Sequence, residues 1–182
     1  MGEPLRFLVD HIETPIGALA VVADEADGLR AVEWTDHDAL MQMQLRRSYG
    51  KNGFSLTPAA NPGGLSAAIR AYFRGDLTAI DGLPVAATGT AFQLLVWRAL
   101  RRIPCGETLS YAALAERIGR ATAIRAVGHA NGTNPVSVVV PCHRLVGSDG
   151  SLTGYGGGIE RKRWLLAHES RARQVSARPR SG

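Results

Sequence analysis

The residues best suited to covalent chemistry are Cys142 and His143, in the run Pro141-Cys142-His143-Arg144. A cysteine thiolate is a strong nucleophile, and a nearby imidazole can accept its proton. Proline often begins a helical turn, so we expect Cys142 to lie where unpaired backbone N–H groups stabilise a thiolate. Neighbouring side chains diverge in an extended segment, so adjacency alone does not place the two in contact. The alternative is an inert core cysteine.

Three segments are expected to position this cysteine. Residues 136–140 form a β-branched run, Val-Ser-Val-Val-Val, which predicts an interior strand or extended segment. Residues 111–118 predict a helix after the N-cap Ser110, and residues 123–131 predict another helix after a short turn. Together, residues 111–131 have a helix-turn-helix pattern, although many helical pairs that never touch DNA share this spacing.

The second helix of this pair has little side-chain bulk, and Arg125 is its one large cation. Small residues let a helix approach another surface closely. A major-groove reader usually carries several long polar side chains, whereas a lean helix with one arginine suits a minor groove. Close packing against another helix is the alternative. The small residues are Ala123, Ala126, Gly128, Ala130 and Gly132.

Composition and charge indicate a globular chain with an anionic partner. The 182 residues are 45% hydrophobic and 20% charged, which is enough apolar material for a core. The net charge of +5 is uneven, because residues 1–91 hold 7 basic and 11 acidic side chains, whereas residues 92–144 hold 7 and 2. A concentrated positive charge favours nucleic acid, and a solvated basic face is the alternative.

The first part of the chain predicts a small domain without recognisable chemistry. Leu5 to Ile12, Leu19 to Ala23 and Leu29 to Trp34 are expected to form an antiparallel meander. Helices are expected at Asp38 to Tyr49 and at Leu65 to Arg74. Neither a dinucleotide-binding nor a P-loop glycine motif occurs in the sequence.

A linker is expected near residue 87. After it, Thr90 and Gln93 predict a capping box that opens a helix ended before Pro104. We therefore expect an α+β fold, with a small antiparallel-sheet domain at 1–87 and a mostly helical domain at 88–169. The basic segment 170–182 is expected to be a disordered tail.

The cysteine count and the N-terminal segment indicate a cytoplasmic protein. Cys105 and Cys142 lack the spacing of a disulfide framework or a zinc ribbon, so no metal is expected. The first thirteen residues lack the apolar core of a secretory signal, and no run is long enough to span a bilayer. No membrane partner is expected.

The motifs of this chain, taken in order, resemble those of one DNA-repair family. The chain is similar to the O6-alkylguanine-DNA alkyltransferases, also called methylated-DNA-protein-cysteine methyltransferases, and specifically to the bacterial constitutive form over residues 5–169. The motifs that carry the resemblance are Asn61-Pro62-Gly63-Gly64-Leu65, Ile103-Pro104-Cys105-Gly106, Asn134-Pro135, Pro141-Cys142-His143-Arg144, Gly154-Tyr155-Gly156-Gly157-Gly158 and His168-Glu169.

The resemblance implies that Cys142 accepts the alkyl group of O6-alkylguanine irreversibly, in a single turnover that needs no cofactor. It implies that His143 deprotonates the thiol through a water and that Glu169 orients His143. It also implies that Asn134 orders the turn that holds Cys142, and that Tyr111 protonates the departing guanine.

The same resemblance implies that a monomer binds double-stranded DNA through the minor groove. The damaged nucleotide would be extruded, with Arg125 entering the duplex in its place. The remaining implied DNA and substrate contacts are Ala123, Ala126, Gly128, Val140, Tyr155, Gly156 and Gly157. Activity on O4-alkylthymine, alkyl-size preference and cooperative assembly on DNA stay open.

Two other functions compete with alkyl transfer. A Cys–His hydrolase would need turnover and an oxyanion hole, which the neighbouring residues do not suggest. A damage-binding relative without transfer activity would lack the acceptor, whereas Cys142 is present. Ile124, His129 and Gly156 depart from residues common in the family, which bears on the fit to DNA and to the substrate.

Overall fold

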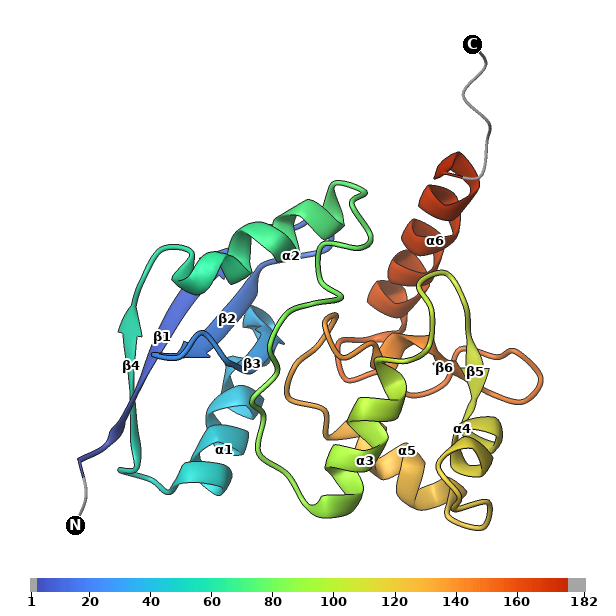
Figure 1. Ribbon diagram of the computed structural model, residues 1–182, viewed down its shortest axis with the longest axis horizontal. Helices are drawn as coiled ribbons and strands as arrows, with labels where there is room; N and C mark the ends of the chain where they lie inside the picture. Colours follow the sequence, from blue (N-terminus) through green and yellow to red (C-terminus); the bar gives the residue numbers. More distant parts are fainter. Residues whose placement is uncertain (1–2, 177–182) are drawn as a thin grey trace.

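The N-terminal part of the computed structural model is built on a four-stranded sheet in the order β3-β2-β1-β4 (Figure 1). The structure describes the backbone of residues 3–176 and the side chains of residues 3–171. Strands β1 (Leu5–Ile12), β2 (Leu19–Asp24) and β3 (Leu29–Trp34) form the predicted antiparallel meander. Strand β4 (Phe54–Pro58) pairs parallel to β1 and was not predicted, because its five residues are only half-buried and end in proline.

Both faces of this sheet are covered, because alternate residues of each strand point to opposite sides. Val9, Val22 and Ala31 pack with Met41 and Leu45 of α1 (Asp38–Tyr49). The other face packs against α2 (Leu65–Phe73) and the C-terminal part of the chain. Both helices were predicted, with α2 ending one residue early. Short 3₁₀ helices η1 (Thr35–His37) and η2 (Pro62–Gly64) precede α1 and α2.

The C-terminal part is mostly helical. It contains α3 (Ala91–Leu100), α4 (Tyr111–Arg117), α5 (Ile124–Gly132), η3 (Cys142–Arg144) and α6 (Ile159–Ser176), and the two-residue strands β5 (Leu109–Ser110) and β6 (Leu145–Val146) pair in parallel. The predicted capping box of Thr90 and Gln93 opens α3. Ser110 caps α4 by accepting from the Ala113 N–H at 3.1 Å, also as predicted. Helices α4 and α5 form the predicted helix-turn-helix pair.

One hydrophobic core joins the two parts of the chain. It runs from Val21 and Tyr72 in the first part to Val96, Val127 and Leu165 in the second. Single backbone bridges, Leu29 to Val85 and Val32 to Val136, also tie the edge strand β3 to later segments. The first part is therefore placed to support a site in the second.

Two expectations are corrected by the structure. Residues 136–140 are buried but form no strand, because only Val136 pairs with β3 and Val138 has a φ of 70°. The predicted disordered tail is wrong in its first part, since α6 continues to Ser176. Residues 177–182 lie outside the described residues.

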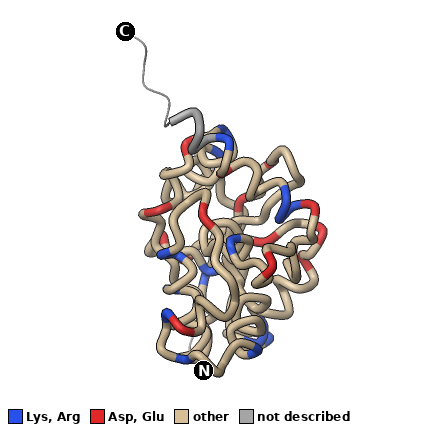
Figure 2. Tube along the Cα trace, turned by 90° about the vertical axis from the view of Figure 1, so that its right-hand side faces the viewer, with Lys and Arg blue, Asp and Glu red and all other residues tan. Residues whose placement is uncertain are grey.

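Two further observations concern the described residues. In residues 3–176, no helix is long and apolar enough to cross a membrane. The described part of the chain also contains no cluster of three metal-ligating side chains. Basic and acidic positions are interspersed along the trace in Figure 2.

Candidate active site

Cys142 lies at the start of η3, directly after Pro141, and its side chain is 5% exposed. Asn134 fixes the loop that leads to it. The Asn134 side chain accepts from the Val136 N–H at 3.0 Å and donates to the Val140 carbonyl at 2.9 Å. The Cys142 N–H donates to the same Val140 carbonyl at 2.8 Å. One amide side chain thus closes the turn whose end holds the thiol.

The edge of the N-terminal sheet also holds this loop. The Val32 N–H donates to the Pro135 carbonyl and the Ser137 N–H donates to the Val32 carbonyl, both at 2.9 Å. The β-branched run was the sequence signal for an extended pairing segment here. Its pairing partner, which lies about a hundred residues earlier in the chain, has no signal in the sequence.

A buried carboxylate, Glu169, lies behind His143 and collects hydrogen bonds from several elements. The Glu169 Oε1 atom lies 2.8 Å from His143 Nε2, and both side chains are fully buried. Arg144 donates to both carboxylate oxygens, at 2.9 and 3.0 Å. The Tyr72 hydroxyl donates at 2.8 Å and the Gly106 N–H at 3.1 Å. Glu169 therefore lies on the buried side of α6.

Sequence reasoning found two members of this network and missed two. Arg144 lies in the Pro-Cys-His-Arg run, so its position next to His143 was a signal, yet it was given no role. Tyr72 comes from α2 in the N-terminal part, where the sequence predicted a helix without recognisable chemistry. A contact between residues so far apart in the sequence depends on the tertiary packing of α2 against α6.

The electrostatics of the network keep Glu169 charged and His143 neutral. Burial alone would raise the pKa of Glu169, but His143 and Arg144 outweigh it and hold that pKa well below its usual range. Burial lowers the pKa of His143, against the opposing effect of Glu169. With its proton on Nε2 toward the carboxylate, His143 presents a lone pair on Nδ1, which is buried and has no hydrogen-bond partner among the described residues. That nitrogen is available as a base.

The surroundings of Cys142 favour the neutral thiol, which corrects the expectation of a thiolate stabilised by unpaired N–H groups. Burial raises the pKa of Cys142 to about 11, although a hydrogen bond from Asn134 opposes the shift. The turn at Pro141 does not compensate, because the Cys142 N–H is already bonded to Val140. A neutral thiol is a weak nucleophile, so reaction requires a base such as His143.

This raised pKa predicts a loss of stability at alkaline pH. The pKa of Cys142 rises from 9.0 in the unfolded chain to about 11 in the folded one, so the unfolded state releases its proton first. The stabilisation is complete below pH 9.0 and is lost as pH rises through about 11. Relative to Cys142→Ala, the native chain is expected to lose about 2 to 3 kcal/mol across that interval in chemical denaturation. Parallel pH curves for the two chains would contradict this.

Other polar side chains surround the thiol. The Tyr111 hydroxyl donates to the Thr153 carbonyl at 3.3 Å, and burial raises the pKa of Tyr111, so the phenol keeps its proton. Lys162 is fully buried and donates to the carbonyls of Leu145 and Thr153. Sequence reasoning missed Lys162, which lies on the apolar side of α6. Burial lowers its pKa, and the charge of a Cys142 thiolate would oppose that shift.

The predicted site residues fall into two groups. Those grouped with the thiol are largely buried: Asn134, Val140, His143, Glu169, Tyr111, Tyr155 and Gly157. Arg125 and Ala126 lie exposed on α5, and Ala123 is its half-buried N-cap. Gly128 of α5 lies close to Tyr111 of the first group, because a Cβ atom there would lie 3.9 Å from the Tyr111 ring. Gly156 is exposed, and Cys105, the second cysteine, is half-buried.

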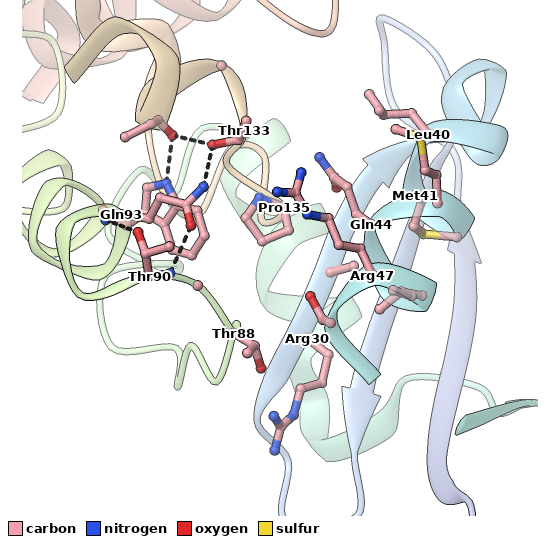
Figure 3. A pocket seen from close by; sticks show the side chains of 18 of the residues that line it. Arg30, Leu40, Met41, Gln44, Arg47, Thr88, Thr90, Gln93, Thr133 and Pro135 are labelled. Atoms are coloured by element: carbon pink, nitrogen blue, oxygen red, sulfur yellow. Dashed lines mark hydrogen bonds between the residues drawn. The ribbon is translucent and has the colours of Figure 1, made fainter. Parts of the chain in front are cut away.

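A separate cleft of about 700 Å³ lies between α1 and the helices α3 and α5. Figure 3 shows Gln44 and Arg47 of α1 on one side and Gln93, Thr90 and Thr133 on the other. Cys142 does not line this cleft. The cleft is therefore not the pocket of the thiol.

The helix-turn-helix pair lies in the same part of the chain as Cys142 and the buried His143–Glu169 pair, a combination that favours a nucleic-acid-directed cysteine enzyme. Comparison with known proteins specifies the class. Residues 9–87 match the family domain described as 6-O-methylguanine DNA methyltransferase, ribonuclease-like domain, and residues 91–171 match the DNA binding domain of the same description. The chain belongs to this 6-O-methylguanine DNA methyltransferase family.

Individual relatives are similar to this chain over most of its length. The chain is 53% identical over 165 residues to the methylated-DNA–protein-cysteine methyltransferase of Shigella flexneri, covering 91% of this chain and 96% of that one. The corresponding protein of Mycolicibacterium paratuberculosis is 43% identical, covering 88% and 90%. The crystal structure of Mycobacterium tuberculosis OGT in complex with DNA superposes with a TM-score of 0.76 at 40% identity, covering 92% and 94%.

Proposed function

We propose that Cys142 is the acceptor in a single-turnover transfer of the alkyl group from O6-alkylguanine in double-stranded DNA. The chain is a DNA-repair enzyme that transfers an alkyl group from DNA to a protein cysteine, as its family membership implies. The observation that carries the assignment to Cys142 is the buried series behind it, in which a charged Glu169 holds a neutral His143. The Glu169 carboxylate also acts on Cys105, whose pKa burial raises to about 12.

The chemical step follows from these positions. His143 Nδ1 takes the Cys142 proton through a bridging water, and Glu169 stabilises the imidazolium that results, against the opposing charge of Arg144. The sulfur then attacks the alkyl carbon, so that an S–C bond forms as the C–O6 bond breaks. Tyr111 donates its phenol proton to the departing guanine and is reprotonated from solvent, to which His143 releases the proton that it took from Cys142. The thioether is not opened by thiol exchange, so each chain reacts once.

Helix α5 supplies the proposed minor-groove surface of a monomer. Its exposed positions carry little bulk apart from Ile124, Arg125 and His129, so the backbone can approach the groove closely. An extruded nucleotide would pass from this surface to the thiol beside Tyr111, where Gly128 leaves room. Because the relatives named above are bacterial and bacterial DNA lies in the cytoplasm, we place the activity there.

Replacing Arg125 by alanine is expected to slow repair of duplex DNA far more than reaction with the free alkylated base. Arg125 is exposed, lies on α5 and would fill the gap left by the extruded nucleotide, whose unstacking costs a few kcal/mol. Rates on both substrates should be compared with those of Arg120→Ala, an exposed arginine in the preceding turn. Equal losses on the two substrates would instead place Arg125 in the chemical step.

The proposal is tested by incubating the protein with a duplex that carries one O6-methylguanine. A retained mass of one methyl group per chain supports transfer. Release of the methyl group with recovery of free protein would indicate a hydrolase. Tight binding without any mass change would indicate a damage-binding protein.

A further inference from the structure

The loop Gly154–Gly158 is anchored at both of its ends. At the first end, the Thr153 carbonyl accepts hydrogen bonds from Tyr111 at 3.3 Å and from Lys162 at 2.8 Å. At the second end, the Gly157 carbonyl accepts from Arg161 Nη1 at 3.2 Å. The first anchor is made by residues of the C-terminal part. The second reaches into the N-terminal part.

Arg161 makes that second anchor from the first turn of α6. Its Nε donates to the Ile16 carbonyl at 2.9 Å, in the turn between β1 and β2. Its two terminal nitrogens donate to both carboxylate oxygens of Asp36 at 3.1 and 2.9 Å. The guanidinium carbon lies 4.4 Å from the ring centroid of Trp34, which is a cation–π distance. A planar guanidinium with several donors can make all of these hydrogen bonds at once, whereas the ammonium group of a lysine cannot.

The surrounding residues leave little room at the Gly157 end of the loop. A Cβ atom at Gly157 would lie 2.4 Å from Trp34 Nε1, so this glycine packs directly on the indole ring. A Cβ atom at Gly17, where φ is +122°, would lie 2.8 Å from Arg161 Nη2. Arg161, with a side chain 18% exposed, is thus packed between the β1–β2 turn, Trp34 and the loop.

The loop in turn contributes to the surroundings of the thiol. The Tyr155 hydroxyl is buried and has no hydrogen-bond partner among the described residues. Burial raises the pKa of Tyr155 well above its usual value, and the charge of a Cys142 thiolate would act in the same direction. Displacing the Gly157 end of the loop would therefore move Tyr155 relative to Cys142.

We propose that Arg161 is a positioning residue, which fixes the Gly157 end of the loop against the N-terminal part and so sets the pocket in which the alkylated base meets Cys142. The identity of the substrate rests on the proposed function, whereas the contacts that Arg161 makes are independent of it. Arg161 touches no reacting atom and acts through the loop.

The test compares Arg161→Ala and Arg161→Lys with Arg163→Ala. Arg163 lies on the same helix and forms an exposed ion pair with Glu160, so it is a matched control for loss of one arginine. Three quantities should be measured: amide exchange of residues 154–158, the transfer rate with methylated duplex and with the free alkylated base, and the affinity for unmodified duplex. Thermal melting confirms that each chain is folded.

Arg161→Ala is expected to lower the transfer rate about 10- to 100-fold on both substrates, because misplacing a pocket wall affects any base that enters it. Exchange of residues 154–158 should become about tenfold faster, while affinity for unmodified duplex is unchanged. The transfer and exchange rates of Arg161→Lys should lie between those of Arg161→Ala and those of the native chain. The rates of Arg163→Ala should match those of the native chain.

The proposal is overturned if Arg161→Ala keeps native rates on both substrates, or if the loop keeps its native protection. It is also overturned if the loss is confined to duplex affinity, since that would make Arg161 a DNA contact. Should the native chain itself transfer no alkyl group, the proposed function fails, whereas the exchange measurement still tests the anchor. Should Arg161→Ala not fold, Arg161→Lys provides the same comparison.

Discussion

Replacing Cys142 by serine is expected to abolish alkyl transfer and to leave DNA binding intact. An alcohol has a far higher pKa than a thiol, so neutral His143 cannot generate a useful nucleophile from it. Serine also fits the space of Cys142, which is 5% exposed and packed in the core. The exposed face of α5 is untouched, so affinity for an alkylated duplex should stay within about twofold of the native value.

Cys105→Ser is the matched control for this change. The hydroxyl of this serine is polar, as suits a position on which the Glu169 carboxylate acts. This variant should transfer alkyl groups at close to the native rate. Loss of transfer in Cys105→Ser together with activity in Cys142→Ser would show that the acceptor has been assigned to the wrong cysteine.

Replacing Glu169 by glutamine should both destabilise the fold and suppress transfer. The change leaves the buried guanidinium of Arg144 without an anion, and breaking a buried pair in this way costs about 3 to 5 kcal/mol. It also removes the group that orients His143, and loss of the orienting carboxylate in a comparable triad lowers the rate about 10⁴-fold. Urea denaturation and transfer kinetics measure the two effects. Glu160→Gln, on the exposed face of α6, should change neither.

A double variant separates the two effects of Glu169. Combining Glu169→Gln with Arg144→Met removes both charges, so much of the lost stability should return. Transfer should stay low, because His143 still lacks its carboxylate. If the double variant recovered transfer along with stability, the role of Glu169 would be to support the fold and not to orient the imidazole.

Sequence patterns located most of the secondary structure, because apolar runs mark β1 to β3 and apolar spacing marks the buried residues of α1 and α2. The caps at Thr90 and Ser110 were also predictable, since capping depends on residues within one turn. Strand β4 was missed because its pairing with β1 is parallel and non-local. The strand predicted at residues 136–140 was wrong for a related reason. The β-branched composition of these residues reflects burial in a turn, in which Val138 has a left-handed backbone conformation.

The candidate site divides in the same way. Cys142, His143, Asn134 and Glu169 carry motif signals, and the structure brings them together. The thiol pKa was predicted in the wrong direction, because burial depends on the packed fold and not on the local turn. Tyr72, Lys162 and Arg161 were not assigned roles, since each acts through contacts with distant segments that one sequence cannot display.

The most direct test of the account is a titration with excess duplex that carries O6-methylguanine, followed by peptide mapping of the protein. The account predicts that repair stops at one methyl group per chain, with the added mass on the peptide that contains Cys142 and none on the peptide of Cys105. Continued repair beyond one equivalent, or a methyl group found on any residue other than Cys142, would contradict it.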